Sequence, residues 1–204
     1  MAQSFAQYGA VVIAIDAPLS RRAPPGLMVF PEDREEQIQL IKDLQRAVDV
    51  LRARPNVDAT RIAYVGVSYG GAMGVLFVGI ERRLKAAALV VADAGLVTHN
   101  TGAQGFKYIS GLPCDRRAAW MRAMAPIEPI RFIGNANVPL LLQNGTLDEA
   151  VPKSDAAALH AVAPEPKDIR WYGAGHGLNQ QAVIDRLNWL RDRIGLDATA
   201  GGAS

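Results

Sequence analysis

The fold is decided by residues 61–73, which read RIAYVGVSYGGAM. An apolar run leads directly into Gly66-Val67-Ser68-Tyr69-Gly70, and an apolar stretch of helical character follows it. A serine flanked in this way fits a sharp turn from strand to helix, in which its neighbours Gly66 and Gly70 must lack bulk and its Oγ projects above a sheet. The alternative is a glycine-rich turn in which the serine has no role. The context favours a nucleophile at the positive end of a helix dipole.

Working outward from this turn, five short runs rich in Val, Ile, Leu and Ala predict strands. They are residues 10–16, 61–67, 86–92, 138–143 and 168–171. The first four are apolar on consecutive positions, as expected of strands covered on both faces in a mostly parallel sheet.

Amphipathic helical patterns separate these runs. One extends from Ile38 to Leu51 and ends before Pro55, and another extends from Val183 to Ile194, where Gly195 is placed to cap it. Strands and helices in alternation predict an α/β fold, with a mostly parallel sheet of about five strands and helices on both faces.

Length and composition indicate one domain over residues 1–204. The chain has 50% hydrophobic residues, and its 22 Lys and Arg nearly balance 20 Asp and Glu. A net charge of +2 gives no basic stripe, so nucleic acid is not expected as a partner. Cys114 is the single cysteine, which excludes a disulfide scaffold.

The amino-terminal residues argue against export and against a membrane. They carry no basic region, and the apolar run 11–15 is too short for a signal sequence or a bilayer span. We therefore expect a soluble, cytoplasmic protein without a membrane partner.

A long insertion separates the third and fourth predicted strands. Residues 93–137 are too many for a plain crossover helix, although 116–124 could form a short one. Long excursions at a sheet edge often build lids and binding walls, so this segment is expected to be lid-like. Its bulky side chains are candidate substrate contacts: Phe106, Tyr108, Trp120 and Met124. The alternative is a connection that only packs its own aromatic residues.

A serine nucleophile needs a base, and the chain has three histidines. His160 falls in the helical stretch 153–162 and is expected at the surface or its boundary. His99 lies in the insertion, where a structural role is favoured over contact with a ligand. His176 follows the last predicted strand within GAGHG, residues 173–177, a loop able to bring the ring to the carboxyl ends of the strands. We predict that His176 is the base.

The acid that orients this base is predicted at Asp148. The fourth strand ends in NGTLDE, residues 144–149, where we expect a tight turn at Asn144-Gly145 followed by the carboxylate. Glu149 would point away if Asp148 points inward. Asp93, after the third strand, is the competitor, and its alternative role is that of a solvated turn residue or helix cap.

Three motifs together resemble the α/β-hydrolase superfamily, close to its dienelactone-hydrolase and prolyl-oligopeptidase-like esterase branches. They are residues 66–71, 142–152 and 174–176. The resemblance implies a serine hydrolase of small-molecule esters that needs no metal and no organic cofactor. The nucleophile is Ser68, where dienelactone hydrolases have cysteine. The implied roles are Ser68, Asp148 and His176 as the triad, with the backbone N–H of Tyr69 in the oxyanion hole.

The leading functional expectation is a carboxylesterase that cleaves short-chain acyl esters through an acyl-enzyme. A peptidase of the prolyl-oligopeptidase type would share this mechanism, although such enzymes usually carry a large additional domain. A third reading is a catalytically weak or dead hydrolase fold that binds a ligand or a partner chain.

The resemblance also implies a further strand, which would come before residue 10 in the chain and would lie in the sheet between the strands predicted at residues 10–16 and 61–67. A loop after this strand would give the second oxyanion donor. No such strand precedes residue 10. Three outcomes are open: the two flanking strands pair directly, a second chain completes the sheet in a homo-oligomer, or the gene begins upstream of Met1.

Overall fold

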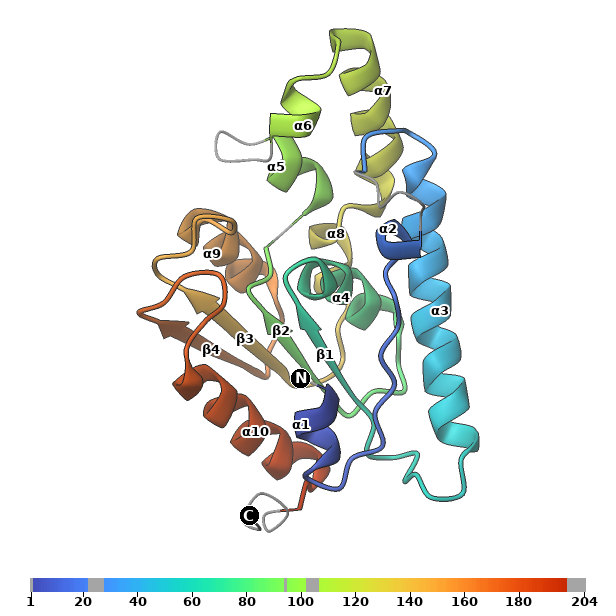
Figure 1. Ribbon diagram of the computed structural model, residues 1–204, viewed down its shortest axis with the longest axis vertical. Helices are drawn as coiled ribbons and strands as arrows, with labels where there is room; N and C mark the ends of the chain where they lie inside the picture. Colours follow the sequence, from blue (N-terminus) through green and yellow to red (C-terminus); the bar gives the residue numbers. More distant parts are fainter. Residues whose placement is uncertain (1, 22–27, 94, 102–106, 198–204) are drawn as a thin grey trace.

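The computed structural model of the protein describes residues 2–21, 28–93, 95–101 and 107–197. In this part of the chain a parallel sheet of four strands forms the centre (Figure 1). The strands are β1 (Ala63–Val67), β2 (Ala86–Val90), β3 (Leu140–Gly145) and β4 (Lys167–Tyr172), adjacent in that order. The α/β fold with a parallel sheet is therefore confirmed.

Helices alternate with the strands as the periodicity indicates. They are α1 (Ala2–Ala6), α2 (Pro18–Arg21), α3 (Asp33–Ala53), α4 (Tyr69–Ile80), α5 (Leu96–Thr101), α6 (Lys107–Ser110), α7 (Cys114–Met124), the 3₁₀ turn η1 (Ala125–Ile127), α8 (Ile130–Ile133), α9 (Lys153–Val162) and α10 (Gln180–Ile194). Helix α3 ends shortly before Pro55, and α10 ends at Gly195, whose φ of +64° is the left-handed cap that a glycine accepts without strain.

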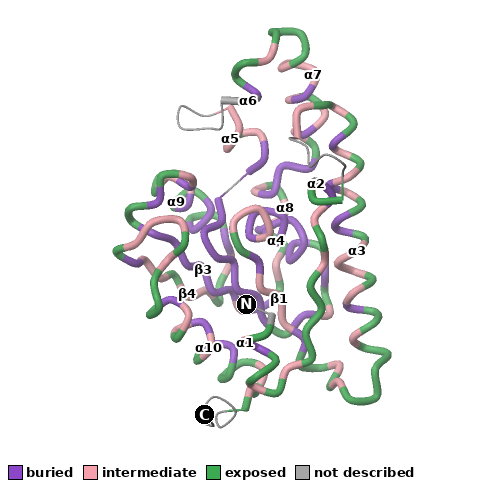
Figure 2. The backbone as a smooth tube through the Cα atoms, in the orientation of Figure 1, coloured by how far each residue is buried: buried purple, intermediate pink, exposed green. Residues whose placement is uncertain are grey.

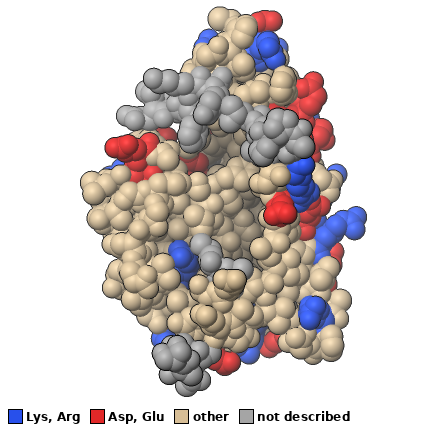
Figure 3. All heavy atoms as spheres, viewed as in Figure 1, with Lys and Arg blue, Asp and Glu red and all other residues tan. Residues whose placement is uncertain are grey.

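Both faces of the sheet are covered, which explains the consecutive apolar positions in its central strands. Leu89 of β2 and Leu142 of β3 pack in one cluster with residues of α3 and α4. Ala88 and Leu141 point the other way and pack against Phe5 of α1 and residues of α10. Figure 2 shows β2, β3 and α4 as the buried centre. On the face seen in Figure 3, charged side chains are sparse over the sheet and lie mostly along the margins.

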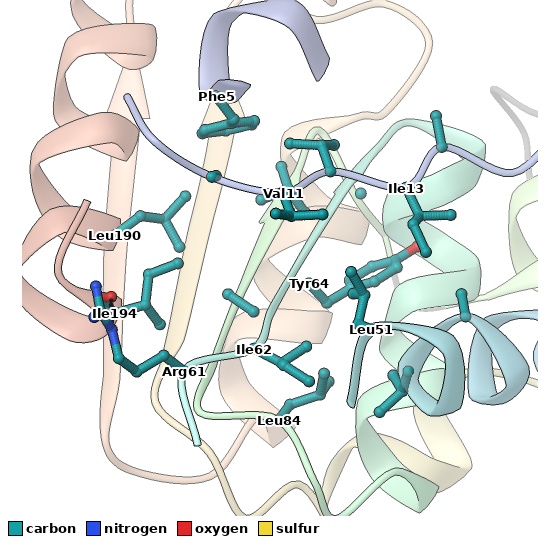
Figure 4. Close-up of a pocket in the computed structure, with 18 of the residues that line it drawn as sticks. Phe5, Val11, Ile13, Leu51, Arg61, Ile62, Tyr64, Leu84, Leu190 and Ile194 are labelled. Carbon is teal, nitrogen blue, oxygen red and sulfur yellow. Dashed lines mark hydrogen bonds between the residues drawn. The ribbon is translucent and has the colours of Figure 1, made fainter. Parts of the chain in front are cut away.

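The predicted strand at residues 10–16 is not a strand. This segment is extended but does not belong to the sheet, and Val11, Val12 and Ile13 are each close to 40% exposed. Among the described residues β1 pairs with β2 alone, so it is an edge strand. The outcome in which residues 10–16 and β1 pair directly is therefore wrong, and the sheet has four strands rather than five. A cavity of about 660 Å³, lined by residues of both segments, lies between them (Figure 4).

The insertion forms a helical cap above the carboxyl ends of the strands (Figure 1). Helix α8 returns the chain to the body and packs against α4. The buried carboxylate of Glu128 accepts hydrogen bonds from the backbone N–H groups of Leu96, Val97 and Thr98. These are amino-terminal N–H groups of α5, which have no partner inside the helix, so Glu128 fixes where α5 begins.

No helix in the described ranges is long and apolar enough to cross a bilayer.

Candidate active site

Ser68 occupies a strained turn between β1 and α4. Its φ of +53° and ψ of −118° are rare for a residue with a side chain, and such strain is maintained only where the surroundings impose it. Here Ser68 N donates to Val90 O of β2 at 2.9 Å, and Ser68 O accepts from Ala72 N in the first turn of α4 at 2.9 Å. The turn is therefore held from both sides, as the Gly-x-Ser-x-Gly pattern predicts.

The glycines of this turn have unequal roles. A Cβ on Gly66 would lie 2.2 Å from the carbonyl oxygen of Gly70, so Gly66 must lack a side chain. A Cβ on Gly70 would meet only the hydroxyl of Tyr64, at an ordinary 3.9 Å. The prediction is thus right for Gly66 and wrong for Gly70, whose carbonyl instead accepts a hydrogen bond from Tyr64 at 2.6 Å. Gly71 is the other tight position, because a Cβ there would lie 2.9 Å from Val90 O.

His176 lies between the serine and a carboxylate. Its Nε2 is 2.7 Å from Ser68 Oγ, and its Nδ1 is 2.9 Å from Oδ2 and 3.1 Å from Oδ1 of Asp148. In the tautomer that satisfies both contacts, Nδ1–H donates to Asp148 and Nε2 accepts the serine hydroxyl proton. The structure thus brings together three side chains that are far apart in the sequence.

The carboxylate of Asp148 is rigidly held. Its side chain is fully buried, whereas that of His176 is 36% exposed and accessible from solvent. Asp148 Oδ1 also accepts the backbone N–H groups of Ala150 and Val151, each at 2.9 Å. Backbone donors fix the carboxylate toward the imidazole, which in turn fixes the orientation of the ring.

The loop that carries His176 is fastened to the end of β3, a feature that the sequence analysis missed. Thr146 N donates to Tyr172 O at 2.8 Å, and Leu147 N donates to Ala174 O at 3.1 Å. The approach is so close that a Cβ on Gly145 would lie 2.2 Å from Ala174 O. Gly145 therefore ends β3 rather than forming the tight turn expected at Asn144-Gly145. The available signal was a glycine at the end of a buried strand.

Asp93, the competing acid, pairs with a different histidine. Its carboxylate is buried and contacts Nδ1 of His99, while His176 pairs with Asp148. The hydrogen bond that the His99 ring donates to the Asp93 carboxylate raises the pKa of His99, against the effect of burial. Asp93 is therefore neither a solvated turn residue nor the partner of the base, and His99 has the structural contact that the sequence analysis favoured.

His160 is not at the surface as predicted. It is 5% exposed, and its Nε2 lies 3.0 Å from Oδ1 of Asn144, whose side-chain amide donates to Ala92 O at 3.0 Å. Burial lowers the pKa of His160 to about 4. This histidine joins α9 to the ends of β2 and β3, a structural position that helical periodicity could not reveal.

The predicted substrate contacts in the insertion are only partly described. Trp120 and Met124 have no exposed surface and belong to the main hydrophobic cluster, so in this structure they are core residues of α7 rather than pocket walls. Phe106 and the side chain of Tyr108 lie outside the described residues. Within the described ranges, no group of three or more His, Cys, Asp or Glu could hold a metal ion.

Comparison with models of protein families identifies the family of this chain. The model of the prolyl oligopeptidase family matches residues 30–187, which include all three residues of the Ser68, Asp148 and His176 cluster. The chain belongs to the prolyl oligopeptidase family. It is 28% identical over 163 residues to the uncharacterized peptidase YuxL of Bacillus subtilis, covering 72% of this chain and 24% of that protein. It is 30% identical over 135 residues to the uncharacterized protein YfhR of Escherichia coli O157:H7, covering 65% of this chain and 44% of that one.

Solved structures agree with this family at the level of the fold. The acetyl xylan esterase from Paenibacillus sp. R4 superimposes with a TM-score of 0.68 at 21% identity, covering 78% of this chain and 53% of the esterase. The fold of this member of the prolyl oligopeptidase family is therefore that of the α/β hydrolases. The chain spans between about a quarter and about half of the length of these three proteins.

Proposed function

We propose that the protein is a serine hydrolase that cleaves short-chain acyl esters through Ser68, His176 and Asp148. The observation that carries this proposal is the 2.7 Å contact between Ser68 Oγ and His176 Nε2, with Asp148 on the opposite side of the imidazole. A nucleophile hydrogen-bonded to a base, which a buried carboxylate orients, is the arrangement that activates a hydroxyl.

Acyl transfer follows from these contacts. Ser68 Oγ attacks the ester carbonyl while His176 Nε2 takes the hydroxyl proton, and Asp148 stabilises the resulting imidazolium. The imidazolium then gives its proton to the leaving alkoxide, which departs as the alcohol and leaves an acyl-serine. Water attacks the acyl-serine with its proton passing to His176, and the carboxylic acid leaves as the proton returns to Ser68.

The developing oxyanion needs hydrogen-bond donors. Tyr69 is the first residue of α4, so its backbone N–H lies at the positive end of that helix beside Ser68. We assign it to the oxyanion, where one donor contributes about 10²–10³ in rate. The side chain of Tyr69 holds this turn against α3, because its hydroxyl donates a hydrogen bond to Gln37 of that helix.

A peptidase is the second candidate, because the family and the relative YuxL carry that name. The two activities use the same residues and differ in the leaving group, which is an alcohol in one and an amine in the other. Turnover of p-nitrophenyl acetate and of an alanyl p-nitroanilide at equal concentrations separates them. The esterase proposal predicts much the larger kcat/KM for the acetate ester, and a larger value for the anilide contradicts it.

Two controls complete this experiment. Ser68→Ala should abolish hydrolysis of both substrates, since any remaining rate would come from another group or from a contaminant. Hydrolysis of neither substrate by the unaltered protein would instead favour the third reading, a hydrolase fold that acts as a binding module.

A further inference from the structure

The loops that carry Asp148 and His176 meet at one backbone carbonyl, that of Tyr172 at the end of β4. Tyr172 O accepts hydrogen bonds from Thr146 N and Ala174 N, each at 2.8 Å, and from Thr146 Oγ1 at 3.1 Å. Thr146 stands two residues before Asp148 in the chain. Ala174 stands two residues before His176. The carbonyl of Tyr172 therefore fixes the loop of the acid and the loop of the base at the same point.

The side chain of Tyr172 ends among buried polar groups between the sheet and α10. Gln143 of β3 has no exposed surface, and its Nε2 donates to the Tyr172 hydroxyl and to Ala182 O of α10, each at 2.8 Å. Its Oε1 accepts a hydrogen bond from Nη1 of Arg186 at 2.9 Å. The Tyr172 hydroxyl in turn donates to Oδ2 of Asp185 at 2.9 Å. We call the side chains of Gln143, Tyr172, Asp185 and Arg186 the polar cluster.

The hydrogen bonds of the polar cluster each have one possible direction. A guanidinium only donates and a backbone carbonyl only accepts, so Gln143 must turn its oxygen to Arg186 and its nitrogen to Ala182 O. That nitrogen also faces the Tyr172 hydroxyl, whose own proton is therefore directed to the carboxylate of Asp185. The cluster specifies a single arrangement of these side chains, which apolar contacts would not impose.

Packing alone does not explain the polar cluster. Arg186 is 5% exposed, its guanidinium contacts an amide oxygen rather than a carboxylate, and within the described ranges its Nε has no hydrogen-bond partner. Burial lowers the pKa of Arg186, as expected of a site that is unfavourable for a cation. Apolar side chains of similar volume commonly give equal or greater stability at such a position. Ala88 and Leu141 on the same face of the sheet are apolar, whereas the cluster lies toward the carboxyl ends of β3 and β4, beside the catalytic loops.

We propose that the polar cluster positions the catalytic acid and base. Arg186 and Gln143 hold the side chain of Tyr172, and the carbonyl of Tyr172 holds the loops of Asp148 and His176. This inference rests on the proposed function, because it assigns positioning residues to that reaction. Arg186 and Gln143 are buried, so they act through the two loops and not on a substrate.

Tyr172→Phe tests this role, because it keeps the ring and removes only the hydroxyl. Gln143 and Asp185 then lose the group that joins them. We expect kcat for p-nitrophenyl acetate to fall about tenfold with KM within about twofold, since a small displacement of reacting groups lowers the rate rather than the affinity. Arg186→Met should give a similar loss, because it leaves Oε1 of Gln143 without its donor.

The two substitutions combined show whether the cluster acts as one unit. If it does, Tyr172→Phe with Arg186→Met should lower kcat no more than about threefold beyond the larger single loss. Two independent effects would multiply to about a hundredfold, and that result would overturn the proposal.

Trp189→Phe is the matched control. Trp189 lies three residues after Arg186 on α10, and its indole N–H donates to Asp168 near the amino end of β4. This contact joins the same helix to the same strand, at the end away from the catalytic loops. Trp189→Phe should lower the free energy of unfolding in urea and leave kcat within about twofold of the unaltered protein. An equal loss of kcat in this control would mean that any weakening between α10 and β4 lowers activity, and it would overturn the proposal.

The tautomer of His176 gives a second readout, which needs no turnover. Asp148 holds the ring proton on Nδ1, and a ring that loses this contact shifts toward the form protonated on Nε2. Long-range proton–nitrogen NMR spectra of the protein with isotope-labelled histidine distinguish the two forms at about pH 9, where an ordinary histidine is neutral. We expect the Nδ1–H form in the unaltered protein and in Trp189→Phe, and a mixture of both forms in Tyr172→Phe and Arg186→Met.

The proposal requires both changes in the cluster variants. A fall in kcat with the tautomer unchanged would place the effect outside the pair of Asp148 and His176, and unchanged kcat would show that the cluster does not position them; either result overturns the proposal. If the unaltered protein hydrolyses no ester, the proposed function fails, whereas the tautomer measurement still decides whether the cluster positions His176.

Discussion

Gly145→Ala tests whether the close approach of two loops sets the catalytic geometry. The new Cβ would lie 2.2 Å from Ala174 O, and an ordinary contact of 3.4 Å requires this carbonyl to retreat by about 1.2 Å, the difference between the two distances. His176 follows two residues later in the same loop. If it shares the displacement, its 2.7 Å contact with Ser68 Oγ lengthens to about 3.9 Å, beyond hydrogen-bond range.

A misplacement of this size at a reacting group costs about 10² in rate. We therefore expect kcat for p-nitrophenyl acetate to fall about a hundredfold in Gly145→Ala, with far-UV circular dichroism unchanged. Gly173→Ala is the matched control, because it lies in the same loop and its Cβ would have no neighbour within 4 Å. If Gly145→Ala retains activity within about twofold of the control, the loop contact does not position His176 and the reasoning is refuted.

Three further predictions concern the groups around this site. Asp148→Asn should lower kcat by roughly 10⁴, since an amide cannot stabilise the imidazolium, whereas Asp93→Asn should retain most of the activity. A larger loss of activity in Asp93→Asn than in Asp148→Asn would return the acid role to Asp93. Glu128→Ala should lower the free energy of unfolding, measured in urea, by about 1–3 kcal/mol, because it leaves one buried and two partly buried N–H groups of α5 without their acceptor. A loss below about 0.5 kcal/mol would contradict that role. The pKa of His160 is lowered from 6.5 to about 4, so the unfolded chain binds the extra proton between these values. The free energy of unfolding should therefore be highest above pH 6.5 and should decrease as the pH falls toward 4, by at most about 1.4 kcal/mol per pH unit. His160→Gln should abolish this pH dependence of the free energy. An unchanged slope in that variant would exclude His160 as the cause.

The catalytic cluster was readable from the sequence because a parallel sheet imposes it. Carboxyl ends of parallel strands meet at one edge, so residues that follow β1, β3 and β4 converge there whatever the connections between them. Ser68, Asp148 and His176 each follow such a strand directly, and the glycines beside them marked the turns. The approximate bounds of these four strands along the chain followed from the same apolar runs.

Other features depend on contacts between distant segments, which no local pattern records. Residues 10–16 have the composition of a buried strand, but a strand exists only where a neighbour pairs with it, and a cavity lies between this segment and β1. His160 was expected on an outer face of its helix, although that face packs against Asn144 at the ends of two strands. Trp120 and Met124 resembled binding residues because bulk alone does not distinguish a pocket wall from a core.

The central claim is that His176 and Asp148 make one hydroxyl reactive. Mass spectrometry of the protein after incubation with a fluorophosphonate tests it most directly, because the reagent modifies only activated serines. One adduct located on Ser68 is expected, together with labelling slowed by several orders of magnitude in His176→Ala. An unmodified Ser68, or labelling at the same rate without the imidazole, would contradict the account.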